Sequence, residues 1–128
     1  MPPLRTECPP GTCICQREEL LADPAADARV LLLTRHEEQR LVERLENLTS
    51  LADLRHLIGL IQKQLGVVIT VQPGPNEVRT LRGILITIEP RPGLCRKTRK
   101  ALPAAIRRAL DAHNEIVFEL LNENSLFG

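Results

Sequence analysis

The chain has 128 residues and a formal net charge of +1, with 17 basic and 16 acidic side chains. This length suits one domain, and 43% apolar with 26% charged residues is typical of a folded protein rather than a disordered one. No apolar run reaches the roughly 18 residues of a membrane span, and residues 1–7 lack the apolar core of a secretory signal. We therefore expect a cytoplasmic protein with no membrane segment. Because Phe118 and Phe127 are its two aromatic residues, the core must be aliphatic.

The N-terminal part of the chain is rich in proline and cysteine. Residues 1–15 are predicted to form an extended arm ahead of a single domain at 16–128. The first expected element of that domain is a short helix over 16–22, which ends before Asp23 and Pro24. The aliphatic run 29–33 is long enough for one buried strand.

Two amphipathic helices are predicted next, over 34–48 and 50–65. Thr34 with Glu37 has the spacing of a capping box, and Ser50 is the expected cap of the second helix. Apolar residues recur at the three-four spacing of a buried helical face in both segments. Gly66 is well placed to end the second helix. The short joint between the two helices predicts an αα-hairpin.

After Gly66 the apolar residues alternate, which indicates strands. We expect one strand over 67–72, a turn at 73–76 and a return strand over 77–89. Strict alternation would bury Arg82. A bulge at Gly83 would instead direct Leu81 inward and Arg82 outward.

The C-terminal part is predicted to be helical. Pro103 suits the first turn of a helix, and a last helix is expected over 115–123, where acidic residues recur every four positions. The predicted fold class is therefore α+β, with the helical hairpin packed on a short antiparallel sheet and flanked by C-terminal helices. The order of elements also allows a winged-helix arrangement, with the loop at 73–77 as the wing.

Four cysteines give the ligand count of a tetrathiolate metal site: Cys8, Cys13, Cys15 and Cys95. Their spacing differs from the paired C-x2-C of zinc sites and from the C-x4-C-x2-C of plant-type iron–sulfur proteins. Zinc is the first expectation and an iron–sulfur cluster the second. The alternatives are ordinary reduced thiols or a redox disulfide. The cations that follow Cys95 would favour its thiolate form.

Basic and acidic residues are segregated near the C-terminus. Between Glu89 and Asp111 there are seven cations and no acid: Arg91, Arg96, Lys97, Arg99, Lys100, Arg107 and Arg108. Such a basic run is typical of a binding site for phosphates or another polyanion. The lack of Trp and Tyr disfavours base stacking, so a nucleic-acid partner would be duplex DNA or RNA recognised through its phosphates. The alternative is a solvated face that pairs with the acidic C-terminal segment, within the chain, in a homodimer or with a protein partner.

The sequence contains no phosphate-binding loop, dinucleotide fingerprint or nucleophile elbow. It therefore predicts a non-enzymatic binding or regulatory protein that engages nucleic acid or another polyanion through residues 91–108. The competing hypothesis is a metal-binding redox or accessory protein that uses the four cysteines.

Overall fold

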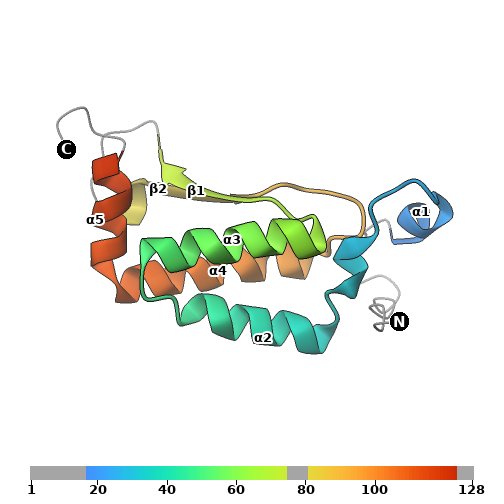
Figure 1. Cartoon of the computed structure of the whole chain (residues 1–128), viewed down its shortest axis with the longest axis horizontal. Coiled ribbons are helices and arrows are strands. Elements are labelled where there is room, and N and C mark those ends of the chain that lie inside the picture. The colour runs from blue at the N-terminus through green and yellow to red at the C-terminus, as the bar shows by residue number, and fades with distance from the viewer. Residues whose placement is uncertain (1–16, 75–80, 124–128) are drawn as a thin grey trace.

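The computed structural model describes residues 17–74 and 81–123, so the predicted arm at 1–15 lies outside it. The described part is mostly helical with one two-stranded antiparallel sheet (Figure 1), which confirms the α+β class. Its helices are α1 (Arg17–Ala22), α2 (Arg35–Glu46), α3 (Leu51–Leu65), α4 (Arg96–Ala112) and α5 (Asn114–Glu123). The strands are β1 (Ile69–Pro73) and β2 (Ile84–Ile88), and two 3-10 helices are η1 (Arg29–Leu32) and η2 (Leu81–Gly83). None of the helices in these ranges is long and apolar enough to cross a membrane.

Helix α4 packs against α2, β2, α5 and η2. The α2 helix lies along α4 and contacts it far more than it contacts α3, and β2 also rests on α4. Both α2 and α4 begin at the same end of the molecule (Figure 1), and Arg108 of α4 pairs with Glu46 near the end of α2. The α2 and α3 helices run antiparallel, as a hairpin requires, but they pack on different elements: α2 on α4, and α3 on η1, α5 and β1.

The core is aliphatic, as the composition predicts. Buried residues from η1, the helices and both strands form one hydrophobic cluster. Full burial of each large aliphatic side chain contributes about 1.5–3 kcal/mol to folding. The largest fully buried side chains are Leu31, Leu45, Leu48, Leu54, Ile84, Leu102, Ile106, Leu110, Ile116, Val30 and Val67.

The predicted helix caps are present. The Thr34 hydroxyl accepts a hydrogen bond from the Glu37 amide at 3.3 Å, and the Ser50 hydroxyl accepts one from the Asp53 amide at 3.0 Å. Gly66 ends α3 in the left-handed conformation, with φ 70°. The second half of the Thr34 capping box is missing, because the Thr34 amide donates to the Leu32 carbonyl at 2.9 Å instead of to Glu37.

The sheet pairs β1 with β2 in one register, in which Val71 faces Ile86. The side chains of β2 alternate as predicted, with Ile84 buried and Leu85 exposed. The return strand is shorter than predicted, and a 3-10 turn, η2, takes the place of the expected bulge at Gly83. The turn residues 75–76 and the start of the predicted return strand, 77–80, lie outside the described residues.

The strand predicted at 29–33 is wrong, because 3-10 helix η1 occupies this segment. Its amides find acceptors a few residues away: Leu31 donates to the Ala28 carbonyl and Leu33 to the Val30 carbonyl. The apolar run reflects burial, since Val30 and Leu31 are fully buried, and not strand pairing. A winged helix needs a strand here, so that arrangement is not adopted.

The predicted start of the C-terminal helix at Pro103 is also wrong. Helix α4 begins at Arg96, and Pro103 lies inside it as the eighth residue. Proline has no amide hydrogen, so the Arg99 carbonyl loses its usual helical donor. The buried stripe that includes Thr98 and Leu102 continues on both sides of the proline, and its packing keeps the segment helical.

Candidate polyanion-binding site

The start of α4 is held in place by the loop that precedes it. Gly93 has φ 89°, and a side chain there would meet Leu20 and Val30 at 2.6 and 2.7 Å, so this loop can lie against the core only with glycine. Leu94 and Cys95 are buried next to it, and Cys95 is the residue that caps α4. The first turns of α4 are therefore anchored to α1 and η1.

Four cations lie in the first two turns of α4: Arg96, Lys97, Arg99 and Lys100, which we call the α4 basic cluster. Three of them are exposed, and Arg99 is half-buried. Within residues 17–74 and 81–123, the side chains of these four residues form no hydrogen bond or ion pair with another side chain or with a carbonyl. The Nε atom of Arg99 is buried without such a partner.

The electrostatics of this cluster are unfavourable for the isolated helix. The N-terminus of a helix carries a partial positive charge, which acidic residues normally offset, yet the first turn of α4 has no acid. Arg96 and Lys100 are also four positions apart, a spacing at which like charges cost about 0.2–0.5 kcal/mol per pair. A bound anion would relieve both penalties.

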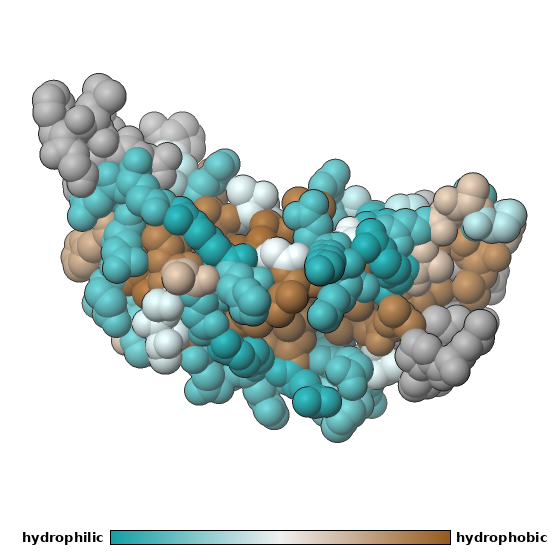
Figure 2. Space-filling view, viewed as in Figure 1, coloured by the Kyte–Doolittle hydropathy of each residue, from teal (hydrophilic) through white to brown (hydrophobic). Residues whose placement is uncertain are grey.

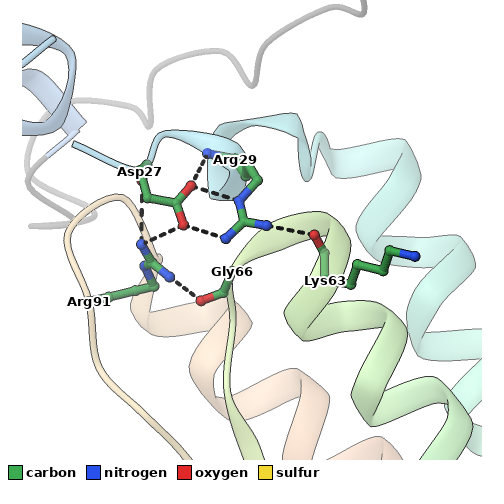
Figure 3. A network of polar contacts seen from close by, with 5 residues as sticks. All are labelled: Asp27, Arg29, Lys63, Gly66 and Arg91. Carbon is green, nitrogen blue, oxygen red and sulfur yellow. Dashed lines mark hydrogen bonds and ion pairs between the residues drawn. The ribbon is translucent and has the colours of Figure 1, made fainter. Parts of the chain in front are cut away.

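Arg91, also predicted as a binding residue, has its guanidinium engaged within the protein (Figure 3). It donates to the Gly66 carbonyl, and its Nη2 lies 3.4 Å from the Asp27 carboxylate. Arg29 holds the same carboxylate through Nε and Nη2, at 2.9 and 2.7 Å, and donates to the Lys63 carbonyl at 2.6 Å. We call Asp27, Arg29 and Arg91, with these two carbonyls, the Asp27 clamp.

The Asp27 clamp stabilises the end of α3. Carbonyls at a helix C-terminus lack helical donors and carry partial negative charge, so the two guanidinium groups satisfy them and offset their charge. The side-chain hydrogen bonds from Arg29 have the largest effect and hold the pKa of Asp27 well below its usual range. Burial, the next largest effect, raises this pKa, but the Arg29 amide and the charges of Arg29 and Arg91 add to the lowering. Arg91, with 24% of its side chain exposed, thus contributes to the fold.

The last two predicted cations also have partners. Arg107 donates to the Ile84 carbonyl at 3.2 Å, which ties α4 to β2, and Arg108 donates to Glu46 at 3.0 Å. The structure therefore divides the seven predicted residues into three that hold elements together and four that have no such contact in the described part of the chain.

The acidic C-terminal segment does not pair with the α4 basic cluster in the described residues. Glu123 accepts a hydrogen bond from Arg55 of α3 at 2.8 Å, and Glu115 lies 3.2 Å from His113. Helix α5, which carries these acids, packs at the far end of α4 from the cluster (Figure 1). Pairing of the basic cluster with the acidic segment within one chain is thus not seen between residues 96–100 and the acids up to Glu123.

The predicted metal site falls mostly outside the described residues. Cys8, Cys13 and Cys15 lie in the segment that the structure does not describe, and Cys95 is buried at the start of α4. In the described ranges, no three His, Cys, Asp or Glu side chains come together as metal ligands. Zinc or iron–sulfur binding by the four cysteines stays a prediction.

Sequence reasoning missed the Asp27 clamp. Its members come from three segments that the fold brings together, and Asp27 with Arg29, two residues apart, left no recognisable motif.

No protein-family model, curated protein sequence or solved structure matches this chain. Its function must therefore be argued from the site itself.

Proposed function

We propose that this chain is a cytoplasmic, non-enzymatic binding or regulatory protein that engages a polyanion, with duplex nucleic acid as the first candidate, through the α4 basic cluster. The observation that carries the proposal is the concentration of four cations at the positive end of a helix, without a partner in the part of the chain that the structure describes. In the described part of the chain these side chains add no hydrogen bond or ion pair to the fold, whereas their charge favours a bound anion.

A phosphate group is the anion that such a site suits. Amides in the first turn of a helix point along its axis and donate to phosphate oxygens, and arginine and lysine add charge-assisted hydrogen bonds. Contacts of this kind position a protein on the phosphate backbone without reading its sequence. We therefore expect binding that depends weakly on base sequence.

Duplexes fit this chemistry better than single strands do. Single-stranded sites stack bases on aromatic side chains, and the sequence from Arg91 to Arg108 contains no aromatic residue. The exposed aromatic ring that the structure describes, Phe118, lies on α5, away from the cluster. Four phosphate contacts support non-specific affinity in the range of roughly 10⁻⁴–10⁻⁶ M at physiological salt.

Charge reversal in the cluster tests the proposal. Lys97 and Lys100 are exposed, so Lys97→Glu with Lys100→Glu should leave the fold intact and reduce affinity for a fluorescently labelled duplex at least about tenfold. The matched control reverses Arg40 and Arg82, which are also exposed and change the net charge equally. It should bind within about twofold of the parent protein.

Comparing the two double variants distinguishes binding at the α4 basic cluster from binding that depends only on the net charge of the protein. Equal losses in the two double variants would show that only the overall charge matters and would reject the cluster as the site. Binding of heparin or polyphosphate without binding of duplex DNA or RNA would replace nucleic acid with another polyanion. If none of these binds at low salt, the proposed function is wrong.

A further inference from the structure

A second feature, separate from the α4 basic cluster, is a pocket of about 520 Å³ between α2 and α3, next to η1. Figure 2 shows hydrophobic surface between the hydrophilic side chains of these helices. Most of the lining is aliphatic and includes Leu41 of α2 and Leu57, Leu60, Ile61 and Leu65 of α3. The polar lining is confined to one end of the helix pair, where α2 begins and α3 ends: Thr34, His36, Glu37 and Gln64.

The fold itself creates this pocket. The α2 helix packs against α4 and makes little contact with α3, so a gap is left between α2 and α3. The two helices are joined at one end of the gap by Arg44 and Asp53, whose charged atoms lie 2.5 Å apart. At the other end, Arg29 of η1 donates to the Lys63 carbonyl of α3 at 2.6 Å. The gap is thus bounded by fixed elements, and its volume lies within the roughly 300–1,000 Å³ of small-molecule sites.

The aliphatic walls indicate a ligand with an alkyl chain. They contain no aromatic ring on which a planar ligand could stack, and the half-buried Leu41, Leu60 and Leu65 have apolar surface left to cover. At the rise of an α-helix, the wall from Leu57 to Leu65 is about 12 Å long, which suits an alkyl chain of medium length. Each methylene buried against these walls should raise affinity about fourfold.

The lining also indicates the charge of the head group, because Glu37 is the one charged residue among the side chains that line the pocket. Its carboxylate lies 3.8 Å from Nη1 of Arg40, which is beyond hydrogen-bond distance. The two side chains are 52% and 68% exposed, so water screens this ion pair. In the described ranges the Glu37 carboxylate accepts no hydrogen bond. Its oxygens are therefore available to a ligand that donates hydrogen bonds.

The charges beside the polar end disfavour an anion and allow a cation. Glu38, the next residue along α2, has a buried Oε1 atom without a hydrogen-bond partner in the described residues, so it would repel an anion placed near it. Arg35 and Lys63 do not line the pocket and are exposed, so water screens their charges. We propose that the pocket binds a medium-chain primary aliphatic amine, with its chain along α3 and its ammonium group donating to Glu37.

Three probes that share one alkyl chain test the head group: decylamine, decanol and decanoate, each below its micelle concentration at pH 7. A primary aliphatic amine is protonated at this pH, as the lysine ammonium is with its pKa of about 10.4. Decylamine should bind the full chain at least about threefold more tightly than decanol, and decanoate should bind most weakly. Decanol or decanoate binding as tight as that of decylamine would overturn the ammonium head group.

Methyl NMR measures these affinities and locates the site. The methyl signals of Leu41, Leu60 and Leu65 should shift and saturate together on addition of decylamine. Leu85, an exposed leucine on β2, is the internal control and should not shift. Equal shifts at Leu85, or no saturable shifts at all, would show that the pocket is not the binding site.

Two single variants test the role of Glu37. Glu37→Gln removes the charge but keeps the backbone amide that Thr34 caps, so the fold should persist. It should weaken decylamine binding at least about threefold and leave decanol binding unchanged. Glu43→Gln is the matched control, because Glu43 is an exposed acid of the same helix that does not line this pocket. It should change neither affinity. Equal losses of decylamine affinity in the two variants would refute Glu37 as the partner of the ammonium group.

Discussion

Replacing Asp27 with asparagine removes the carboxylate on which the Asp27 clamp depends. Asparagine keeps one oxygen, which can still accept from the Arg29 amide. Its NH₂ group, however, replaces the oxygen that lies 2.7 Å from Nη2 of Arg29 and 3.4 Å from Nη2 of Arg91. The variant therefore loses both ion pairs and leaves two guanidinium groups side by side without a counter-charge.

The expected loss of stability follows from the exposure of these groups. The side chains of Arg29, Asp27 and Arg91 are 48%, 33% and 24% exposed, so water screens the pairs and each is worth no more than about 1 kcal/mol. Asp27→Asn should therefore lower the free energy of unfolding by about 1–2 kcal/mol. With a urea m-value of about 2 kcal/mol/M, the midpoint falls by about 0.5–1 M while the m-value stays the same.

Asp111→Asn is the matched control, because Asp111 is exposed and has no partner in the described part of the chain. It should change stability by less than about 0.5 kcal/mol. Urea unfolding followed by circular dichroism measures both variants. If Asp27→Asn is no less stable than Asp111→Asn, the clamp does not stabilise the protein and this reasoning is wrong.

The stability difference between the parent protein and Asp27→Asn should change with pH in one direction. Folding lowers the pKa of Asp27, mainly because Arg29 donates hydrogen bonds to its carboxylate. The clamp therefore stabilises the protein fully above about pH 4 and loses this contribution as the pH falls further. The stability difference between parent and Asp27→Asn should be constant from about pH 5 to 8 and shrink toward about pH 2. A difference that grows on acidification would contradict this assignment.

Three further predictions concern the backbone and the cysteines. Gly66→Ala should lower the free energy of unfolding by at least about 2 kcal/mol, because φ is 70° and the new Cβ would lie 2.5 Å from the Asp27 carboxylate. A loss of less than about 0.5 kcal/mol, measured by urea unfolding, would contradict this prediction. Pro103→Ala should stabilise the protein by about 1–2 kcal/mol, because alanine restores a donor to the Arg99 carbonyl; an unchanged or lower melting temperature would refute this. If the four cysteines share an ion, elemental analysis should find zinc or iron in the purified chain, and Cys95→Ser should remove it. Purified protein that is folded but contains no metal would refute the metal-binding hypothesis.

The helices bounded by local signals were predictable from the sequence. The hydroxyls of Thr34 and Ser50 bond to amides three residues away, and Gly66 ends its helix through its own backbone conformation. Two elements depend on tertiary context and were mispredicted. Residues 29–33 have no neighbouring strand in the described part of the fold, and the helix around Pro103 persists because its buried stripe packs on both sides.

The sequence located the candidate site to a stretch of the chain, but it did not identify which residues in that stretch are available for binding. The charge pattern indicated residues 91–108, but the acceptors that engage three of the cations lie far away in sequence: Gly66 for Arg91, Ile84 for Arg107 and Glu46 for Arg108. No local pattern encodes such contacts. The pocket between α2 and α3 was not predictable for a similar reason, since it exists because α2 packs on α4.

The salt dependence of duplex binding tests the proposed function most directly. If the four cations of the α4 basic cluster each neutralise one phosphate, a plot of log K against log salt concentration should have a slope of about −3.6. Affinity would then fall about 150-fold between about 50 and 200 mM salt. A slope near zero would mean that no phosphate is contacted, and a slope of about −6 would mean that Arg91, Arg107 and Arg108 also bind. Either result would contradict the assignment of polyanion binding to Arg96, Lys97, Arg99 and Lys100.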